Sequence, residues 1–352
     1  MTPNNGSQSE WVYDWNAATP AHIPAGQRIL LNDETLRDGL QNPSVHDPSI
    51  GEKIEILHLT EALGIDSLNI GLPGAGPRAA ADVEALAREI ATNRMRIKPN
   101  CAARTVEADI RPIAEISQRV GIAIEAATFL GSSPIRRLVE DWTVDHLERT
   151  TEKAVQFAVA QNLPVMYVTE DTVRTDPDTV KRLYTTAIRN GARAIVLCDT
   201  VGHATPDGAY NLVKFAIENI VKPSGEKIRV DWHGHNDRGL SISNSLAALA
   251  AGADCVHAAA IIKAFRKGDK ELANIVYSGV PSHLFGLEQV IEIGPMSGKS
   301  NVLFWLEKHG KPTDDATVNR IFDAAKQSAR VLTDAEVLAL IAEPAASHPA
   351  RN

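Results

Sequence analysis

The sequence predicts an α/β protein, a (β/α)8 TIM barrel followed by a small C-terminal helical appendage. From residue 28 onward, short apolar or β-rich runs alternate with segments of helical periodicity. The runs recur at intervals of roughly 25–40 residues, the length of a strand, a helix and two connections in a parallel sheet. No glycine-rich dinucleotide fingerprint follows the first run, so a closed barrel fits better than a doubly wound sheet.

Eight runs are expected to form the barrel strands. They are Arg28–Leu36, Ser67–Leu72, Arg96–Cys101, Ile122–Phe129, Val165–Thr169, Ala194–Asp199, Ile228–His235 and Asp254–Ala260. The helices expected from apolar spacing are Ile50–Leu63, Ala79–Ala91, Val144–Gln161, Ser241–Ala251, Ser300–Lys308, Asp315–Ala329 and Thr333–Ala342. A chain of 352 residues accommodates one barrel and an extension, since such barrels typically take about 250 residues.

The chain is expected to divide into four regions. Residues 1–27 form a polar N-terminal arm, 28–280 the barrel, 281–345 the helical appendage and 346–352 a frayed tail. The arm carries Trp11, Tyr13 and Trp15. It is either loosely ordered or docks these aromatic side chains on the barrel or on a partner subunit.

Composition excludes several classes of protein. Hydrophobic residues make up 44% and charged residues 23%, as in a globular protein with a large core. No apolar run reaches the roughly 18–20 residues of a membrane span, and no signal-peptide pattern is present, which predicts a cytoplasmic protein without a membrane partner. A net charge of −8 argues against a nucleic-acid partner. Cys101, Cys198 and Cys255 are widely spaced and are expected to be reduced core residues.

Two motifs at strand ends carry candidate metal ligands. The first strand leads into a turn with Arg37 and Asp38, at the carboxyl end where barrels build active sites, although this pair could instead be a surface ion pair. The seventh strand ends in His233, Gly234 and His235, and residues two apart on a strand point to the same face. Two histidines and one carboxylate would leave open positions for water and substrate, which suits Zn²⁺, Mn²⁺, Co²⁺ or Mg²⁺.

Further polar residues follow the fifth and sixth strands. Glu170 is the functional candidate at the end of the fifth strand. Asp176 and Pro177, a little further on, are expected only to begin the next helix as N-cap and first helical residue. Asp199 and Thr200 offer a carboxylate and a hydroxyl at the end of the sixth strand.

In this order along the chain, the motifs resemble the DRE-TIM metallolyase superfamily. Within it they are most similar to the 2-isopropylmalate, homocitrate and citramalate synthase branch, which has an HMGL-like pyruvate carboxyltransferase domain. The resemblance covers about residues 29–310 and rests on DETLRDGLQ at 33–41, EDTVRTDP at 170–177, DTVGHATP at 199–206 and HGHNDRGL at 233–240. It implies that Asp38, His233 and His235 bind the metal ion and that Arg37 is the catalytic electrophile.

The resemblance also implies a reaction and its partners. The metal would chelate the carboxylate and carbonyl of a 2-oxo acid, and a base would remove a proton from acetyl-CoA. The enolate would then attack the carbonyl carbon to give a 2-alkylmalate-like acid, while the metal and Arg37 stabilise the developing charge. The implied substrate-binding residues are Gln41, Asn69, Arg104, Arg136 and Thr200. A homodimer is expected, as for synthases of this kind.

Two departures from the synthase pattern lie near the expected substrate. Asn69 stands where the family usually has Glu. Arg136 stands where the family often has His, a change that suits a substrate with an extra anionic group.

Two further departures concern the metal and the base. After the eighth strand, Asp269 either replaces an Asn that lies at the metal or caps the following helix. Ser300 replaces a His linked to acetyl-CoA activation. Because a serine is no base near neutral pH, either Glu170 or His309 takes that role or the reaction needs no such base.

Two other functions stay open. A lyase or aldolase would break a carbon–carbon bond at the same metal. The segment 258–268 lacks the Cys that hydroxymethylglutaryl-CoA lyases carry there, but hydroxy-oxo-acid aldolases need no such Cys. An inactive barrel kept as a binding or regulatory subunit would explain the lost Glu and His, whereas retention of the three ligands and Arg37 argues against it.

Overall fold

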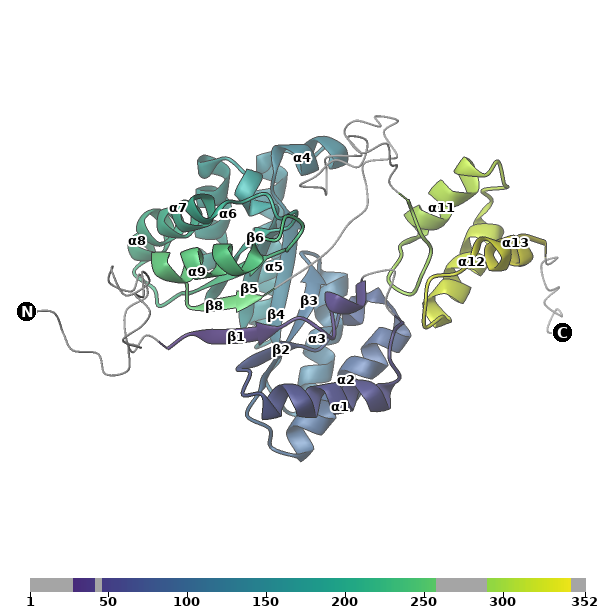
Figure 1. The fold of residues 1–352 in the computed structure, drawn as a ribbon, viewed down its shortest axis with the longest axis horizontal. Coiled ribbons are helices and arrows are strands. Elements are labelled where there is room, and N and C mark those ends of the chain that lie inside the picture. The colour runs from purple at the N-terminus through teal and green to yellow at the C-terminus, as the bar shows by residue number, and fades with distance from the viewer. Residues whose placement is uncertain (1–27, 42–45, 258–289, 343–352) are drawn as a thin grey trace, which may run out of the picture.

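The strands close into a complete barrel, as predicted. The computed structural model describes residues 28–41, 46–257 and 290–342. Eight parallel strands follow one another in chain order, and the first pairs with the last (Figure 1). They are β1 (Leu30–Asp33), β2 (Ser67–Asn69), β3 (Lys98–Arg104), β4 (Glu125–Gly131), β5 (Val165–Glu170), β6 (Ala194–Asp199), β7 (Arg229–Gly234) and β8 (Cys255–His257).

Helices follow the strands and cover the outside of the barrel. Those of the barrel are α1 (Ile50–Ala62), α2 (Pro77–Thr92), α3 (Glu107–Val120), α4 (Pro134–Glu140), α5 (Val144–Ala160), α6 (Pro177–Arg189), α7 (Pro206–Ala216), α8 (Lys222–Ser224) and α9 (Ser241–Ala251). Short helical turns are η2 (Gly39–Gln41), η3 (Pro73–Ala75), η4 (Thr172–Arg174) and η5 (Ile217–Val221). The helices α3 and α4 were not among those expected, and α3 contains Pro112, which removes a backbone donor within the helix.

The first strand is shorter than predicted, and the reason lies in the turn that follows it. The carbonyl of Glu34 accepts hydrogen bonds from the backbone N–H groups of Arg37, Asp38 and Gly39 at 3.1, 2.8 and 3.1 Å. The chain therefore leaves the sheet after Asp33, and the first motif lies in a tight turn at the carboxyl end of the barrel. Strands β3 and β4 instead run further than predicted, to Arg104 and Gly131.

Side chains alternate between two environments along each strand. On β6, Ile195 and Leu197 belong to the large core between strands and helices, whereas Val196 and Cys198 belong to a separate small cluster with Ala127 and others. The small cluster fills the inside of the barrel. Cys101, Cys198 and Cys255 are buried free thiols, as predicted.

The appendage has a core of its own. It comprises α11 (Lys299–Lys308), α12 (Asp315–Gln327) and α13 (Asp334–Ala342), close to the predicted helices. Its buried apolar side chains form a cluster separate from the barrel core: Ile293, Val302, Trp305, Leu306, Val318, Ile321, Ala325 and Val337. The predicted boundaries after residues 27, 280 and 345 and the aromatic residues of the arm lie outside the described residues.

The appendage is attached to the barrel through the segment after α12. The N–H of Asp47 donates to the carbonyl of Ala329 at 2.7 Å, and Arg78 on α2 donates to the carbonyl of Ser328 at 2.8 Å. Arg78 also pairs with the Asp47 carboxylate at 2.7 Å. Among the described residues, no helix is long and apolar enough to span a membrane.

Candidate metal centre

Asp38, His233 and His235 meet at the carboxyl end of the barrel. The Nε2 atoms of His233 and His235 lie 3.4 and 3.9 Å from Oδ2 of Asp38 and 3.2 Å from each other. Asp38 comes from the turn after β1, and His233 lies on β7. His235 follows that strand. The sequence spacing therefore predicted a group of ligand atoms that the fold does bring together.

The chemistry of these three side chains fits a divalent cation. Both carboxylate oxygens of Asp38 are buried and have no hydrogen-bond partner among the described residues, although Oδ1 lies 2.9 Å from Nη1 of Arg37. Burial lowers the pKa of His233 and His235 to about 3, so both imidazoles are neutral, as metal ligands must be. Burial raises the pKa of Asp38 to about 7, against the opposing charge of Arg37. A bound cation would favour the ionised carboxylate instead.

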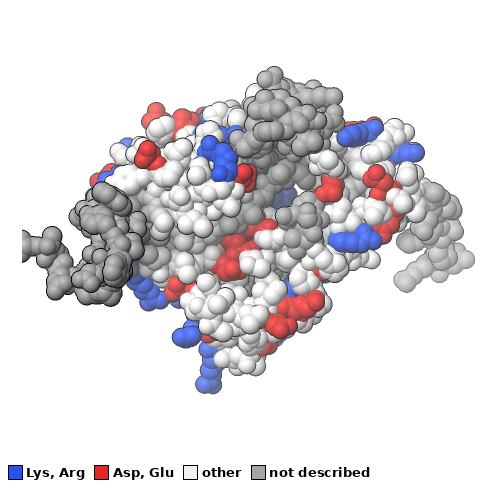
Figure 2. All heavy atoms as spheres, viewed as in Figure 1, with Lys and Arg blue, Asp and Glu red and all other residues white. Residues whose placement is uncertain are grey.

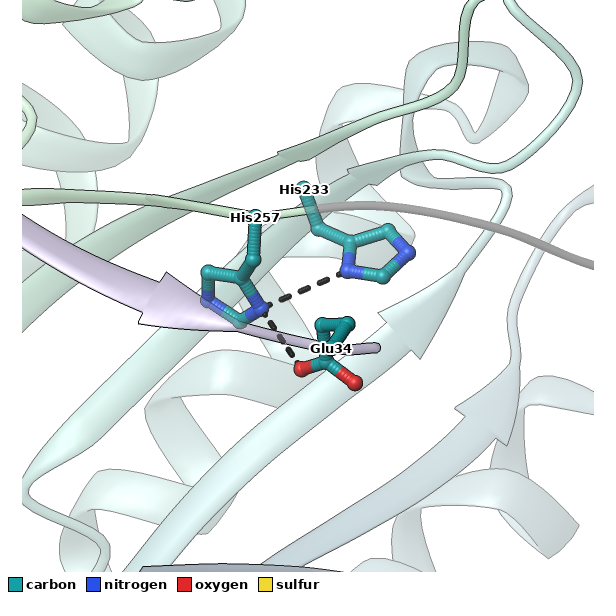
Figure 3. A group of neighbouring side chains, drawn as sticks. All are labelled: Glu34, His233 and His257. Atoms are coloured by element: carbon teal, nitrogen blue, oxygen red, sulfur yellow. Dashed lines mark hydrogen bonds and ion pairs between the residues drawn. The ribbon is translucent and has the colours of Figure 1, made fainter. Parts of the chain in front are cut away.

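Two other groups of side chains have ligand atoms equally close together. Glu34, His233 and His257 form one, shown in Figure 3, and Asp231, Cys255 and His257 form the other. Their carboxylates already accept hydrogen bonds, Glu34 from Arg37 and Asp231 from Arg229, whereas neither oxygen of Asp38 has a hydrogen-bond partner among the described residues. The group around Asp38 is therefore the better candidate for the ion.

Arg37 lies between two carboxylates. Its Nε and Nη2 atoms donate to Oε2 of Glu34 at 3.0 and 2.5 Å, and Nη1 lies 2.9 Å from Asp38. Burial alone would raise the pKa of Glu34, but the charge of Arg37 and the hydrogen bond from His257 outweigh it and hold the pKa at about 2. Glu34 is therefore an ionised, buried carboxylate next to the candidate ligands.

His257 contacts both Glu34 and His233, and it was not among the site residues predicted from the sequence. Its Nδ1 lies 3.1 Å from Glu34 and 3.4 Å from Nδ1 of His233 (Figure 3). Its Nε2 lies 3.5 Å from Asp231. Burial alone would lower the pKa of His257, but the two carboxylates outweigh it and raise the pKa to about 9. His257 pairs in register with His233 on the neighbouring strand. A histidine near the end of the predicted eighth strand was the signal available in the sequence.

With this geometry established, comparisons with known proteins identify the family. Residues 28–277 match the HMGL-like family. The chain belongs to the HMGL-like family. It is 30% identical over 298 residues to a 2-isopropylmalate synthase of Pyrococcus furiosus, covering 83% of this chain and 57% of that protein. It is 35% identical over 233 residues to the enzyme of that name from Heliobacterium modesticaldum, covering 64% of this chain and 43% of that protein.

The HMGL-like chain thus spans about half the length of the curated relatives it matches. Among solved structures it is similar to the HMG-CoA lyase of Bacillus subtilis, with a TM-score of 0.54 at 17% identity, covering 84% of this chain and 98% of that one. The lyase of Brucella melitensis gives a TM-score of 0.52 at 16% identity, covering 85% of this chain and 96% of that one. At such identities the likeness shows the shared barrel fold. The predicted family and fold are both confirmed.

Two of the predicted substrate residues lie within the hydrogen-bond network of this HMGL-like barrel. Asn69 ends β2, and its amide donates to Oε2 of Glu34 at 3.0 Å. The hydroxyl of Thr200, which follows β6, accepts a hydrogen bond from the backbone N–H of Asp171 at 2.8 Å. Asp199 binds the backbone N–H groups of His203 and Ala204, so its carboxylate closes the turn before α7.

Arg136 and Glu170 lie together at the carboxyl ends of β4 and β5. Nε of Arg136 is 3.7 Å from Glu170, and its Nη1 is 3.2 Å from Glu140. Gly131 makes room for this arginine, since a Cβ there would lie 2.2 Å from Cγ of Arg136. An anionic substrate group would have to compete with two carboxylates for this guanidinium.

The remaining predicted site residues are Arg104, Gln41, His309 and Asp269. Arg104 ends β3 and forms a bidentate pair with Asp109, at 2.7 and 2.8 Å. Gln41 lies in η2, directly after the Asp38 turn. His309 caps α11, where its ring stacks on Trp305, and within the described part of the chain no contact joins it to Asp38 or Arg37. Asp269 lies outside the described residues.

A pocket extends from Arg37 toward the appendage. It is lined by barrel residues such as Leu36, Arg37 and Ile70 together with Met296 and Lys326 of the appendage. On the face drawn in Figure 2, acidic side chains gather near the centre, while Lys and Arg are scattered toward its edges.

Proposed function

We propose that the chain catalyses a divalent-metal-dependent Claisen-type condensation of acetyl-CoA with a 2-oxo acid, giving a 2-alkylmalate-like acid. The observation that carries the proposal is the group of Asp38, His233 and His235 with Arg37 beside it. The curated relatives with 30–35% identity, named 2-isopropylmalate synthases, support an acyltransferase. The lyases, at 17% identity or below, support only the fold, which favours the synthase over the lyase alternative.

Each residue has a role that its position supports. A bound Mg²⁺, Mn²⁺, Zn²⁺ or Co²⁺ ion would supply a Lewis acid for the 2-oxo acid. Arg37, always protonated, stabilises negative charge that develops on substrate oxygen. Glu170, at the same rim, is the proposed base for the acetyl group, since His309 is bound to Trp305 in the appendage. The pocket beside Arg37 receives the acyl donor.

The partners of this chain belong to the same proposal. Small-molecule substrates, a cytoplasmic location and a homodimer follow from the resemblance to the synthases. The net charge of −8 supports the absence of a nucleic-acid partner. Light scattering on the purified chain measures the oligomeric state.

The test is release of free CoA from acetyl-CoA with a panel of 2-oxo acids and Mn²⁺ or Mg²⁺. We expect release with at least one acid, and we expect Asp38→Asn and His235→Ala to abolish both release and stoichiometric metal binding. Arg37→Lys keeps metal but loses about 10²–10³-fold in kcat, as for other oxyanion donors. His58→Ala is the matched control, because His58 lies exposed on α1.

Two outcomes would overturn the proposal in different ways. If the chain binds metal and no acid in the panel releases CoA, the condensation is wrong and cleavage of 2-hydroxy acids becomes the reaction to assay. If the purified chain binds no metal at all, the inactive-barrel alternative replaces both.

A further inference from the structure

The Glu34 carboxylate is held by four side chains at once. Its Oε1 accepts from the amide of Asn32 at 2.8 Å and lies 3.1 Å from Nδ1 of His257. Its Oε2 accepts from the amide of Asn69 at 3.0 Å and from Nε and Nη2 of Arg37 at 3.0 and 2.5 Å. All the acceptor positions of a carboxylate are thereby used. The orientation of Glu34 is therefore fixed more tightly than the surrounding packing alone would require.

The donors come from separate strands that meet only in the closed barrel. Asn32 lies on β1, Asn69 on β2 and His257 on β8, and β1 pairs with both of the other strands. Asn32 is itself fixed, because its oxygen accepts from Ser67 at 2.8 Å and from Asn100 at 2.7 Å. Asn32 and Asn69 are buried. Buried polar groups that water does not reach must hydrogen-bond to one another. The network of hydrogen bonds therefore holds Glu34 in one position.

The contacts of Arg37 show what this fixed carboxylate does. Glu34 binds the Nε–Nη2 edge of the guanidinium, and Asp38 lies against Nη1. An arginine side chain has several rotatable bonds, and only a partner on a defined edge restricts the direction of its fork. By taking one edge, Glu34 sets the guanidinium beside the candidate metal centre, where Nη1 lies against Oδ1 of Asp38 and the other oxygen, Oδ2, faces His233.

Position 69 supplies the second observation. The synthase pattern has Glu there, whereas this chain has Asn, whose amide donates to the same Glu34 oxygen that binds Arg37. We propose that Glu34, in the turn after β1, is the positioning residue for Arg37, with Asn69 on β2 holding the same Glu34 oxygen. The inference rests on the proposed function, in which Arg37 stabilises charge on the substrate. Figure 3 shows Glu34 with its histidine neighbour.

Three variants test this role: Glu34→Gln, Asn69→Glu, which places a carboxylate at the neighbouring position, and the double variant with both changes. Glu34→Gln keeps the shape but removes the charge, and we expect kcat to fall about 10–100-fold, as when other supporting partners of a site are removed, with KM for acetyl-CoA nearly unchanged. The double variant places a carboxylate at position 69 instead, and we expect it to recover most of that loss. A merely structural role would lower stability without recovery by the transposed charge.

Matched controls separate local from general effects. Glu84→Gln removes a carboxylate that pairs with Arg88 on the exposed face of α2, and we expect wild-type kcat. Mn²⁺ binding of all the variants should stay close to wild type, which shows that the centre is intact. Glu34→Gln with wild-type kcat, or a double variant that folds, binds Mn²⁺ and is no more active than Glu34→Gln, overturns the proposal.

A measurement that needs no catalysis tests the role of Glu34 independently of the proposed reaction. In chain labelled with ¹⁵N-arginine, the Nε–H resonance of Arg37 is assigned by its absence in Arg37→Lys. We expect slow exchange with solvent in wild type, faster exchange in Glu34→Gln and slow exchange again in the double variant. Unchanged exchange in Glu34→Gln overturns the positioning role. If wild type releases no CoA while exchange behaves as expected, the condensation fails and the role of Glu34 stands.

Discussion

At the scale of single residues, Gly234 lies between the two candidate ligands His233 and His235. His233 and His235 point to one side of the strand, and the backbone between them must leave room for Trp232, which is fully buried. A Cβ on Gly234 would lie 2.6 Å from Nε1 of Trp232, closer than such atoms can approach. The glycine is therefore required by packing against Trp232.

We expect Gly234→Ala to weaken metal binding. Either Trp232 or the backbone between the ligands has to move, and disturbed support of ligands costs about 10–100-fold in metal affinity. Calorimetric titration with Mn²⁺ measures it. Gly208→Ala on α7 is the control, because a Cβ there meets Thr205 at an ordinary 3.6 Å. Wild-type affinity in Gly234→Ala would show that the site tolerates the shift.

At the scale of elements, Tyr184 joins one helix to two strands. It lies on α6, is fully buried, and its hydroxyl donates to the carbonyl of Val196 on β6 at 2.6 Å. The hydroxyl of Thr169 on β5 lies 2.6 Å from the hydroxyl oxygen of Tyr184. The ring of Tyr167 packs edge-on against it, with ring centroids 5.6 Å apart. The polar tip of a buried ring thus holds α6 in place.

Tyr184→Phe should destabilise the barrel while leaving its fold intact. The change leaves a buried carbonyl and a buried hydroxyl with fewer partners, which costs about 1–3 kcal/mol. Urea unfolding followed by circular dichroism measures the difference in free energy of unfolding. Tyr210→Phe on α7 is the matched control, since that side chain is 40% exposed. Equal midpoints for the two variants would contradict the role assigned to Tyr184.

At the scale of the whole molecule, two separate cores are joined by a small polar contact. The appendage packs around its own apolar cluster, and Asp47 and Arg78 bind the carbonyls that follow α12. The pocket beside Arg37 lies between the same two parts. The position of the appendage therefore controls the size of this pocket.

Arg78→Ala is expected to loosen the appendage without unfolding the barrel. Losing the hydrogen bond to Ser328 and the pair with Asp47 removes about 1–2 kcal/mol, a factor of about 5–30 in local opening. Hydrogen exchange of α12 amides followed by mass spectrometry measures that factor. Arg88→Ala on the same helix is the control, because among the described residues Arg88 pairs with Glu84 alone, at the surface. Equal exchange in both variants would mean that apolar contacts hold the appendage.

The sequence by itself determined the barrel and the appendage helices, and it singled out the three candidate ligands that the fold brings together. Strand and helix periods are local properties of the chain, and Ser241–Ala251 matches the predicted helix at both ends. The spacing of His233 and His235 places both imidazoles on one side of β7, whatever the rest of the chain does. Such features depend on neighbours in the sequence and can be inferred from it.

Only the tertiary structure decided which groups surround the ligands. In the sequence, Glu34 is one of several acids in a motif and His257 is an ordinary strand residue. Their contact exists because β8 pairs with β1 in the closed barrel. Asn69 stood out as a departure from a pattern, and its contact with Glu34 gives that departure a meaning. These contacts join residues far apart in the chain, and their geometry exists only once the strands have paired. Which buried charged groups pair depends on the distances between them in the folded chain. The local sequence pattern does not encode these distances.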